Sequence, residues 1–210
     1  IYICVKPLEI HPLLASINRY LDEEKCIVSI TSPFSVEKLE SQVPCQVARM
    51  IPSITNRALS GITLASFGKQ ISKEMRAYLL QSARIYSTPT IIDNNVTRIA
   101  SDLVSCGPAF FGYLAQRYIN AAVNETDISP ELATQLTEKM FIGFGNLLEK
   151  GHYSLPELID KVCVKGGVTG EGIKAIEAEL GEVFPALIQS THRKYKEDIE
   201  KIDNQINANI

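Results

Sequence analysis

The chain has 210 residues, of which 45% are hydrophobic and 21% are charged, and its formal net charge is −3. This composition is typical of a globular protein and excludes a disordered or fibrous chain, while the scattered lysines and arginines exclude a basic stripe for nucleic acid. No apolar run is long enough to span a membrane and no export signal is visible, so we expect a cytosolic protein that contacts neither membrane nor nucleic acid.

The first half of the chain predicts alternating strands and helices. It opens as if a buried strand had been entered midway, with IYICVKP at residues 1–7. Further short, apolar, β-rich segments lie at residues 26–30, 45–51 and 61–67. Helical stretches lie at residues 11–24, 35–42 and 72–85, and a turn-rich stretch follows at residues 87–95. This alternation indicates an α/β layer, usually with parallel strands.

From about residue 96 the pattern is helical almost throughout. Helices are expected at residues 108–125, 129–150 and 154–163. The first two begin with proline, whose missing N–H costs nothing at the first helical position, and the third carries the capping box Ser154-x-x-Glu157. The chain therefore divides near residue 95 into an α/β domain, residues 1–95, and an all-α domain, residues 96–210.

Gly143 and Gly145 lie inside an otherwise apolar helical segment. Each glycine costs about 1 kcal/mol relative to alanine in a helix, so close approach of another helix is the expected compensation. A neighbouring helix of the same chain and a helix of a second subunit explain the two glycines equally well.

Four of the chain's twelve glycines lie in one stretch, KGGVTGEG at residues 165–172, directly before a helical pattern whose expected N-cap is Thr169. Read plainly, this is a flexible loop before a capped helix. Alternatively, its backbone N–H groups form a nest for a small anion such as a carboxylate, and Thr169 offers its hydroxyl to the same ligand. The stretch lacks the G-x-G-x-x-G spacing of a dinucleotide fingerprint, which occurs nowhere in the chain.

The cysteines and histidines indicate no metal site and no nucleophile. The five cysteines are odd in number and lack C-x-x-C spacing, so we expect most of them to be small buried residues. The three histidines lie far apart in the sequence. The locally basic residues 192–196 are expected to form a solvated helix face, with a phosphate or membrane contact as the alternative.

Five segments, in matching order and spacing, carry a resemblance to a known family. They are VKP at residues 5–7, CIVSITSPFSVEKLE at 26–40, RMIPSITNRALSGIT at 49–63, CGPAF at 106–110 and KGGVTGEGIKAIE at 165–177. Over essentially the whole chain they resemble pyrroline-5-carboxylate reductase, which makes proline with a nicotinamide cofactor.

The resemblance implies a partial Rossmann-type domain followed by a helical dimerisation and substrate domain that forms a homodimer. It also implies that the family's first βαβ unit, with its pyrophosphate loop, is missing from the residues given. The complete protein is then expected to bind NADPH, whereas these residues alone are not expected to bind the dinucleotide normally. The positions that match the family's cofactor-binding segments are Val5, Lys6, Pro7, Pro52 and Ser53.

The same resemblance assigns the glycine stretch to the substrate. In the family, backbone N–H groups of this loop receive the substrate carboxylate, which here implies Gly166, Gly167, Val168 and Thr169. The matching threonine lies near the ring nitrogen, so Thr169 is the expected catalytic residue. It would then both cap the helix and touch the substrate.

Departures from the family pattern fall where ligands are expected. They are Thr31-Ser32-Pro33 for a small A-A-G turn, Ser53-Ile54-Thr55 for N-T-P, Arg98 for an acidic residue, Lys139-Met140 for Gln-Thr, and Val164-Lys165 for Ser-Pro. A proline in place of a glycine that lets the backbone approach the nicotinamide is not a neutral change. A kept framework with altered ligand positions is similar to the late-competence, ComER-like branch of the family.

Two functions follow from these observations. The first is an NAD(P)H-dependent reductase that converts 1-pyrroline-5-carboxylate, or a related cyclic imine, to proline. The second is a non-catalytic, ComER-like regulatory paralogue of late competence or sporulation that keeps the dimeric scaffold. The retained glycine stretch and Thr169 favour the enzyme, and the altered residues favour the regulator.

Overall fold

The computed structural model describes residues 1–208, which form two compact units. The first, here called the sheet unit, comprises Ile1–Pro108 with Pro185–Ile210, and the second, the helical unit, is Ala109–Phe184. The domain boundary near residue 95 stays a prediction. In the described residues, the segment just after it and most of the last helix pack with the sheet.

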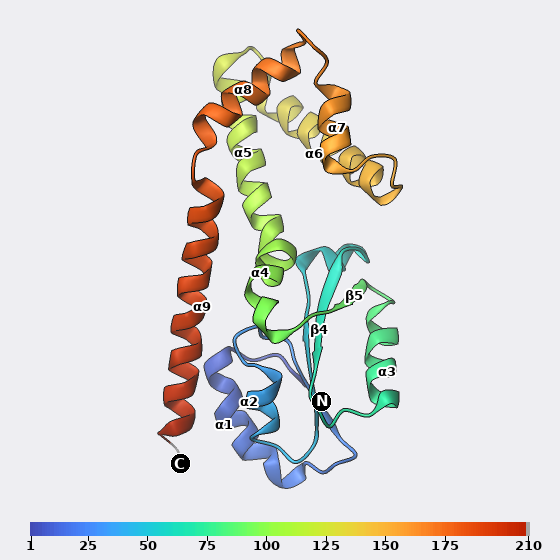
Figure 1. The fold of residues 1–210 in the computed structure, drawn as a ribbon, viewed down its shortest axis with the longest axis vertical. Coiled ribbons are helices and arrows are strands. Elements are labelled where there is room, and N and C mark those ends of the chain that lie inside the picture. The colour runs from blue at the N-terminus through green and yellow to red at the C-terminus, as the bar shows by residue number, and fades with distance from the viewer. Residues whose placement is uncertain (209–210) are drawn as a thin grey trace. The chain divides into compact units, whose positions relative to one another are not determined.

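The sheet unit contains five strands in the order β1-β2-β3-β4-β5 within the described residues (Figure 1). Their bounds are Tyr2–Ile3, Cys26–Ser29, Gln46–Ile51, Ile62–Phe67 and Thr88–Ile91. Neighbouring strands are parallel except β3 and β4, which are antiparallel. The expectation of parallel strands was therefore wrong for that pair. The short 3₁₀ turn η2, Ile54–Ala58, joins β3 to β4, and a connection of that length permits an antiparallel return but no full crossover helix.

The predicted strands at residues 26–30, 45–51 and 61–67 are confirmed as β2, β3 and β4. The turn-rich stretch at residues 87–95, in contrast, contains the strand β5. This strand pairs only with β4, and its residues range from exposed to partly buried. Pro89 is tolerated at such an edge, where a missing N–H costs no ladder bond. An edge strand with little burial lacks the apolar alternation by which strands are recognised.

Helices cover both faces of the sheet (Figure 1). Helices α1 (Pro7–Ile17), α2 (Val36–Glu40) and α9 (Val183–Asn207) pack on one face, and α3 (Lys73–Ala83) packs on the other. Successive strand residues point to opposite faces, so Ile27 lies in the first core and Val28 in the second. Ile202 of α9 is fully buried in the first core, which anchors this helix to the sheet unit.

Helix α1 begins at Pro7, four residues earlier than the predicted stretch at residues 11–24, and ends at Ile17. Pro7 occupies the first helical position, where its fixed φ suits the helix. The Lys6 backbone N–H donates to the Glu9 carboxylate, at 3.1 Å, which satisfies a donor at the helix start. A 3₁₀ turn, η1 (Asn18–Tyr20), then ends the helical stretch.

The chain leaves the sheet through a 3₁₀ turn and an irregular helix. The turn is η3 (Asn94–Val96), followed by α4 (Thr97–Ser101) and the π-helical turn η4 (Asp102–Cys106). Helices α5 (Gly107–Glu125), α6 (Pro130–Glu149), α7 (Leu155–Val162) and α8 (Val168–Leu180) then follow. The predicted caps of α6 and α7 are confirmed, because Ser129 accepts the Leu132 N–H at 3.2 Å and the Ser154 N–H donates to Glu157 at 2.7 Å.

Open space surrounds Gly143 and Gly145 of α6. A Cβ atom built on either glycine meets no described atom within 4 Å. Close approach by another described helix of the helical unit is therefore not what explains these glycines, which is consistent with a second subunit as the explanation.

The described cysteines are not mostly buried, contrary to expectation. Cys26 and Cys45 are buried, Cys106 and Cys163 are partly exposed and Cys4 is exposed, because it lies beyond the end of β1. Burial raises the pKa of the Cys26 thiol to about 11. Within residues 1–208, no helix has both the length and the apolar character needed to cross a membrane.

Candidate functional site

Three loops meet at one edge of the sheet. Strands β1, β2 and β3 are parallel, so their carboxyl ends lie on the same side. The residues that follow these ends are Val5–Pro7, Thr31–Pro33 and Pro52–Ser53. Open α/β sheets bind their ligands in the crevice outside the carboxyl ends of the strands. The structure thus brings all five sequence-predicted cofactor residues to the edge where a nucleotide is expected to bind.

The loop after β1 combines a buried anchor with an exposed cation. Val5 packs against the first core, whereas Lys6 is exposed. Within residues 1–208 the Lys6 ammonium forms no ion pair. Because Lys6 directly precedes the N-terminus of α1, a positive charge and a helix N-terminus coincide at this point.

The turn after β2 is held from two sides. The Ser32 carbonyl accepts hydrogen bonds from the Arg49 Nη1 and from the Tyr195 hydroxyl, each at 3.0 Å. Arg49 comes from β3 and Tyr195 from α9, so two elements far apart in sequence fix one peptide group. Pro33, next along the turn, is buried.

Arg49 is a buried cation whose hydrogen-bond acceptors are all uncharged. Only 1% of its surface is exposed. Besides the Ser32 carbonyl, its guanidinium donates to Asn94 Oδ1 and Thr97 Oγ1, each at 2.6 Å, and to Ser66 Oγ at 3.3 Å. Burial lowers the pKa of Arg49, and the nearby Tyr195 and Glu37 oppose this shift. Arginine nevertheless stays charged at neutral pH.

The loop after β3 is fastened to the π-helical turn η4. Ser53, which is buried, donates its hydroxyl to the Val104 carbonyl at 2.9 Å. In return the Ser105 hydroxyl donates to the Pro52 carbonyl at 3.0 Å. Both expected cofactor residues of this loop are thus tied to one turn, of a kind that is frequent at functional sites. The Ser53 hydroxyl is already engaged within the protein.

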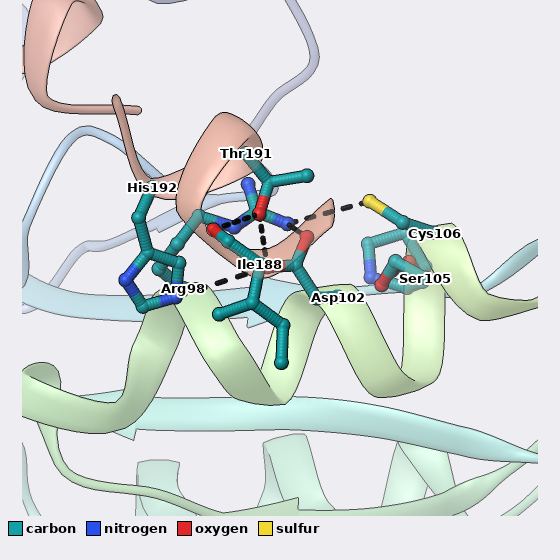
Figure 2. Close-up of polar contacts among 8 residues, drawn as sticks. Arg98, Asp102, Ser105, Cys106, Ile188, Thr191 and His192 are labelled. Atoms are coloured by element: carbon teal, nitrogen blue, oxygen red, sulfur yellow. Dashed lines mark hydrogen bonds and ion pairs between the residues drawn. The ribbon is translucent and has the colours of Figure 1, made fainter. Parts of the chain in front are cut away.

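A polar cluster surrounds Asp102, the first residue of that turn (Figure 2). The Asp102 side chain is 3% exposed and pairs with the Arg98 guanidinium at 2.7 Å. Its second oxygen accepts the Thr191 hydroxyl at 2.7 Å, and the His192 Nε2 lies 3.9 Å from the same oxygen. Arg98 also donates to Cys106 Sγ at 3.3 Å. The cluster therefore joins η4 to α9 within the sheet unit.

The glycine stretch in the helical unit forms a turn before α8. Gly166 has a φ of +77°, a conformation that glycine adopts readily. The helix begins at Val168 with Gly167 in the cap position, so the expectation that Thr169 is the N-cap was wrong. Glycine serves at an N-cap almost as well as threonine, which allows the helix to start two residues earlier. Thr169 lies instead in the first turn.

The N–H groups of this turn are only partly available. The Gly167 N–H donates to the Val164 carbonyl at 2.9 Å. The N–H groups of Val168 and Thr169 lie in the first turn of α8, which offers them no intrahelical acceptor. Among residues 1–208 we find no partner for the Thr169 hydroxyl. An anion bound here would thus meet backbone donors, a hydroxyl and the positive end of the helix dipole.

The predicted residues fall into two groups. The cofactor residues share the edge of the sheet unit, and Gly166, Gly167, Val168 and Thr169 share a turn of the helical unit. No sequence pattern marks Arg49, Asp102, Thr191 or Tyr195 as functional. Arg49 lies in a segment that carried the resemblance, and Thr191 and Tyr195 lie in or beside the basic stretch that was taken for a solvated face.

The architecture defines a class, an α/β unit of Rossmann type combined with helices. Residues 94–198 match the model of the pyrroline-5-carboxylate reductase dimerisation family. ComE operon protein 4 of Bacillus subtilis is 51% identical over 208 residues, which cover 99% of this chain and 76% of that protein. Pyrroline-5-carboxylate reductase 3 of the same organism is 29% identical, covering 98% of this chain and 75% of that protein. The chain belongs to the pyrroline-5-carboxylate reductase family.

Solved structures agree with this fold. A pyrroline-5-carboxylate reductase from Coxiella burnetii superposes with a TM-score of 0.84 at 20% identity, covering 94% of this chain and 74% of that chain. The pyrroline carboxylate reductase of Plasmodium falciparum, solved with NADP bound, gives 0.80 at 22% identity, covering 98% and 80%. The first unit therefore has a Rossmann-type fold and the second is helical, and the match to the dimerisation family spans residues 94–198.

Proposed function

We propose that the protein is an NAD(P)H-dependent reductase that converts 1-pyrroline-5-carboxylate, or a related cyclic imine, to proline. The observation that carries this proposal is the turn before α8, where backbone N–H groups of the first helical turn and the Thr169 hydroxyl have no described partner. A cyclic imino acid offers a carboxylate and a ring nitrogen close together, which suits one anion nest beside one hydroxyl.

The donor set at the edge of the sheet fits a nicotinamide dinucleotide. The unpaired ammonium of Lys6 and the adjoining N-terminus of α1 suit a phosphate or ribose group, and the exposed ring of Pro52 suits an apolar ring face. Val5, Lys6, Pro7, Pro52 and Ser53 would hold the cofactor. Ser53 would act through its backbone, because its hydroxyl is bound to Val104.

The protein's contribution to such a reaction is orientation. NADPH, when bound, supplies a hydride to the C=N carbon. The first turn of α8 would fix the substrate carboxylate, and Thr169 would donate a hydrogen bond near the ring nitrogen. Holding both reactants in one geometry accounts for most of the acceleration that such chemistry needs, so no covalent nucleophile is required.

A homodimer through the helical unit belongs to the same proposal. The matched family model is that of a dimerisation domain. The faces of α5 and α6 expose large apolar side chains, among them Tyr118, Leu132, Leu136 and Met140. Apolar patches of this kind mark interaction sites in proteins that are otherwise polar at the surface.

The test is oxidation of NADPH by the full-length natural protein in the presence of pyrroline-5-carboxylate, with a Thr169→Ala variant beside it. Loss of one transition-state hydrogen bond worth about 1.5–3 kcal/mol should lower kcat by about ten- to a hundred-fold. Thr134→Ala is the matched control, because it removes an exposed hydroxyl of the same unit that only bonds its own helix. Equal turnover in Thr169→Ala and the natural protein would remove Thr169 from the mechanism.

A second function is that of a non-catalytic regulator with the same scaffold. It is favoured because several polar groups of the site are already bound to other groups of the protein. Ser53 and Pro52 are tied to η4, and Arg98 is paired with Asp102 rather than open to a ligand. The relative at 51% identity carries the name ComE operon protein 4 rather than that of a reductase. Calorimetric titration of the full-length protein with NADPH separates the two, since a vestigial site would bind it no better than unrelated nucleotides.

A further inference from the structure

Two hydroxyl groups of α9 reach the loops at the edge of the sheet. Thr191 and Tyr195 are four residues apart, so they lie on the same face of the helix. The Tyr195 hydroxyl donates directly to the Ser32 carbonyl, at 3.0 Å, in the turn after β2. The Thr191 hydroxyl donates to Asp102, at 2.7 Å, at the start of η4.

Thr191 is also connected, through Asp102 and η4, to the loop after β3. Asp102 begins the π-helical turn whose Val104 carbonyl accepts the Ser53 hydroxyl and whose Ser105 hydroxyl donates to the Pro52 carbonyl. A shift of Asp102 would therefore move the hydrogen-bond partners of both Pro52 and Ser53. One helix face thus supports two of the three loops at this edge.

Arg98 joins the two contacts into one cluster. Its guanidinium pairs with Asp102 at 2.7 Å, and its Cζ lies 5.6 Å from the centre of the Tyr195 ring (Figure 2 shows Arg98 beside Asp102 and Thr191). Asp102 is almost fully buried, so removing the Thr191 hydroxyl leaves its second oxygen with the His192 Nε2 at 3.9 Å and without a hydrogen bond. Thr191 and Tyr195 therefore support different loops, and the effects of changing both should add.

The anchorage of α9 does not depend on these two hydroxyls. Ile202 is fully buried in the core beneath α1 and α2, and Asp203 pairs with Lys38 of α2. The lower part of α9 thus holds the helix on the sheet unit. Thr191 and Tyr195 are therefore available to fix the loops rather than the helix.

We propose that Thr191 and Tyr195 are positioning residues that set the conformation of the loops at residues 31–33 and 52–53 for binding of the nicotinamide cofactor. They act through Ser32 and through Asp102 and η4, without touching the cofactor. The link to cofactor affinity rests on the proposed function, whereas the link to loop conformation rests on the contacts alone.

The experiment compares the full-length protein with Thr191→Val, Tyr195→Phe and the double variant. Hydrogen exchange of peptides covering residues 31–35 and 53–56 is measured without ligand, and NADPH affinity is measured by titration. Each single variant should speed exchange in its own loop and weaken NADPH binding about five- to ten-fold, the loss expected for one hydrogen bond. The double variant should lose more than either single variant.

Asp203→Asn is the matched control, because it removes a polar contact of α9 with α2 far along the helix from both loops. It should leave exchange at residues 31–35 and 53–56, and NADPH affinity, within two-fold of the natural protein. Variants that speed loop exchange no more than this control would overturn the inference. A natural protein that fails to bind NADPH would refute the cofactor part and the proposed reductase, while the exchange data still decide whether the two residues position the loops.

Discussion

At the scale of single residues, Arg49 carries a positive charge that is buried in the sheet unit. It is 1% exposed and donates to four uncharged oxygens, from Ser32, Ser66, Asn94 and Thr97. A buried charge without a counter-ion is costly unless hydrogen bonds satisfy it, so this geometry has to be kept as a whole. The planar guanidinium can reach several acceptors at once, which an ammonium on a flexible stem cannot do.

Arg49→Lys should therefore destabilise the protein by about 1–3 kcal/mol, because at least one buried acceptor loses its donor. Urea unfolding of the variant measures this loss. Arg57→Lys is a suitable control, since Arg57 is exposed in η2 and should tolerate the exchange within about 0.5 kcal/mol. An Arg49→Lys variant as stable as the control would mean that the four hydrogen bonds contribute nothing net.

At the scale of elements, the turn from β3 to β4 contains a strained residue. Leu59, the C-cap residue directly after η2, has a φ of +53°, in the left-handed region that costs a side-chain-bearing residue about 1–2 kcal/mol. Its side chain is 73% exposed, so little packing offsets this cost. The element nevertheless forms, because Asn56 ties the turn together through bonds to the Ser53 N–H, at 2.8 Å, and the Ser60 carbonyl, at 2.9 Å.

Leu59→Gly should consequently raise the free energy of unfolding by about 0.5–1 kcal/mol, after allowing for the greater freedom of glycine in the unfolded chain. Leu59→Ala separates backbone strain from the exposed side chain, because it shortens the side chain but keeps the strained φ. We expect a gain in the midpoint of urea unfolding for glycine and none for alanine. Equal effects of the two substitutions would assign the change to the side chain.

Most helices and strands could be predicted from the sequence, but few of the side-chain contacts between them could. Apolar periodicity located β2, β3, β4 and the capped helices α6 and α7, since their patterns reflect local burial and local capping. It missed β5, an edge strand with little burial, and it placed the N-cap of α8 at Thr169 rather than at Gly167. A glycine cap carries no side chain by which sequence could mark it.

Only those residues of the candidate site that directly follow a predicted strand could be placed from the sequence. Residues after strand ends, such as Val5–Pro7 and Pro52–Ser53, can be placed once the strands are known, because parallel strands bring their ends together. Thr191 and Asp102, in contrast, are 89 positions apart, and Tyr195 and Ser32 are 163 apart. No local pattern encodes such pairs, so only the packed structure reveals them.

At the scale of the whole molecule, α6 and its glycines argue for assembly. An apolar groove is lined by Tyr118, Ile119, Ala133, Leu136 and Met140. Further along α6, open space borders Gly143 and Gly145. Two glycines in a helix cost about 2 kcal/mol relative to alanine, and no other described helix of the helical unit comes close enough to either to offset this cost. A partner helix seated on the Leu136 and Met140 face of α6 would remove apolar surface from water and approach closely at Gly143, which lies on that face.

Leu136→Glu should therefore convert the proposed dimer to monomers, because a carboxylate in an apolar interface must be desolvated without a partner. Sedimentation of the purified protein over a range of concentrations measures the change. Lys139→Glu, a new carboxylate at an exposed, already charged position of the same helix, should leave the dimer intact. A Leu136→Glu variant that sediments as a dimer would exclude this face of α6 as the interface, and the two glycines would then need another compensation.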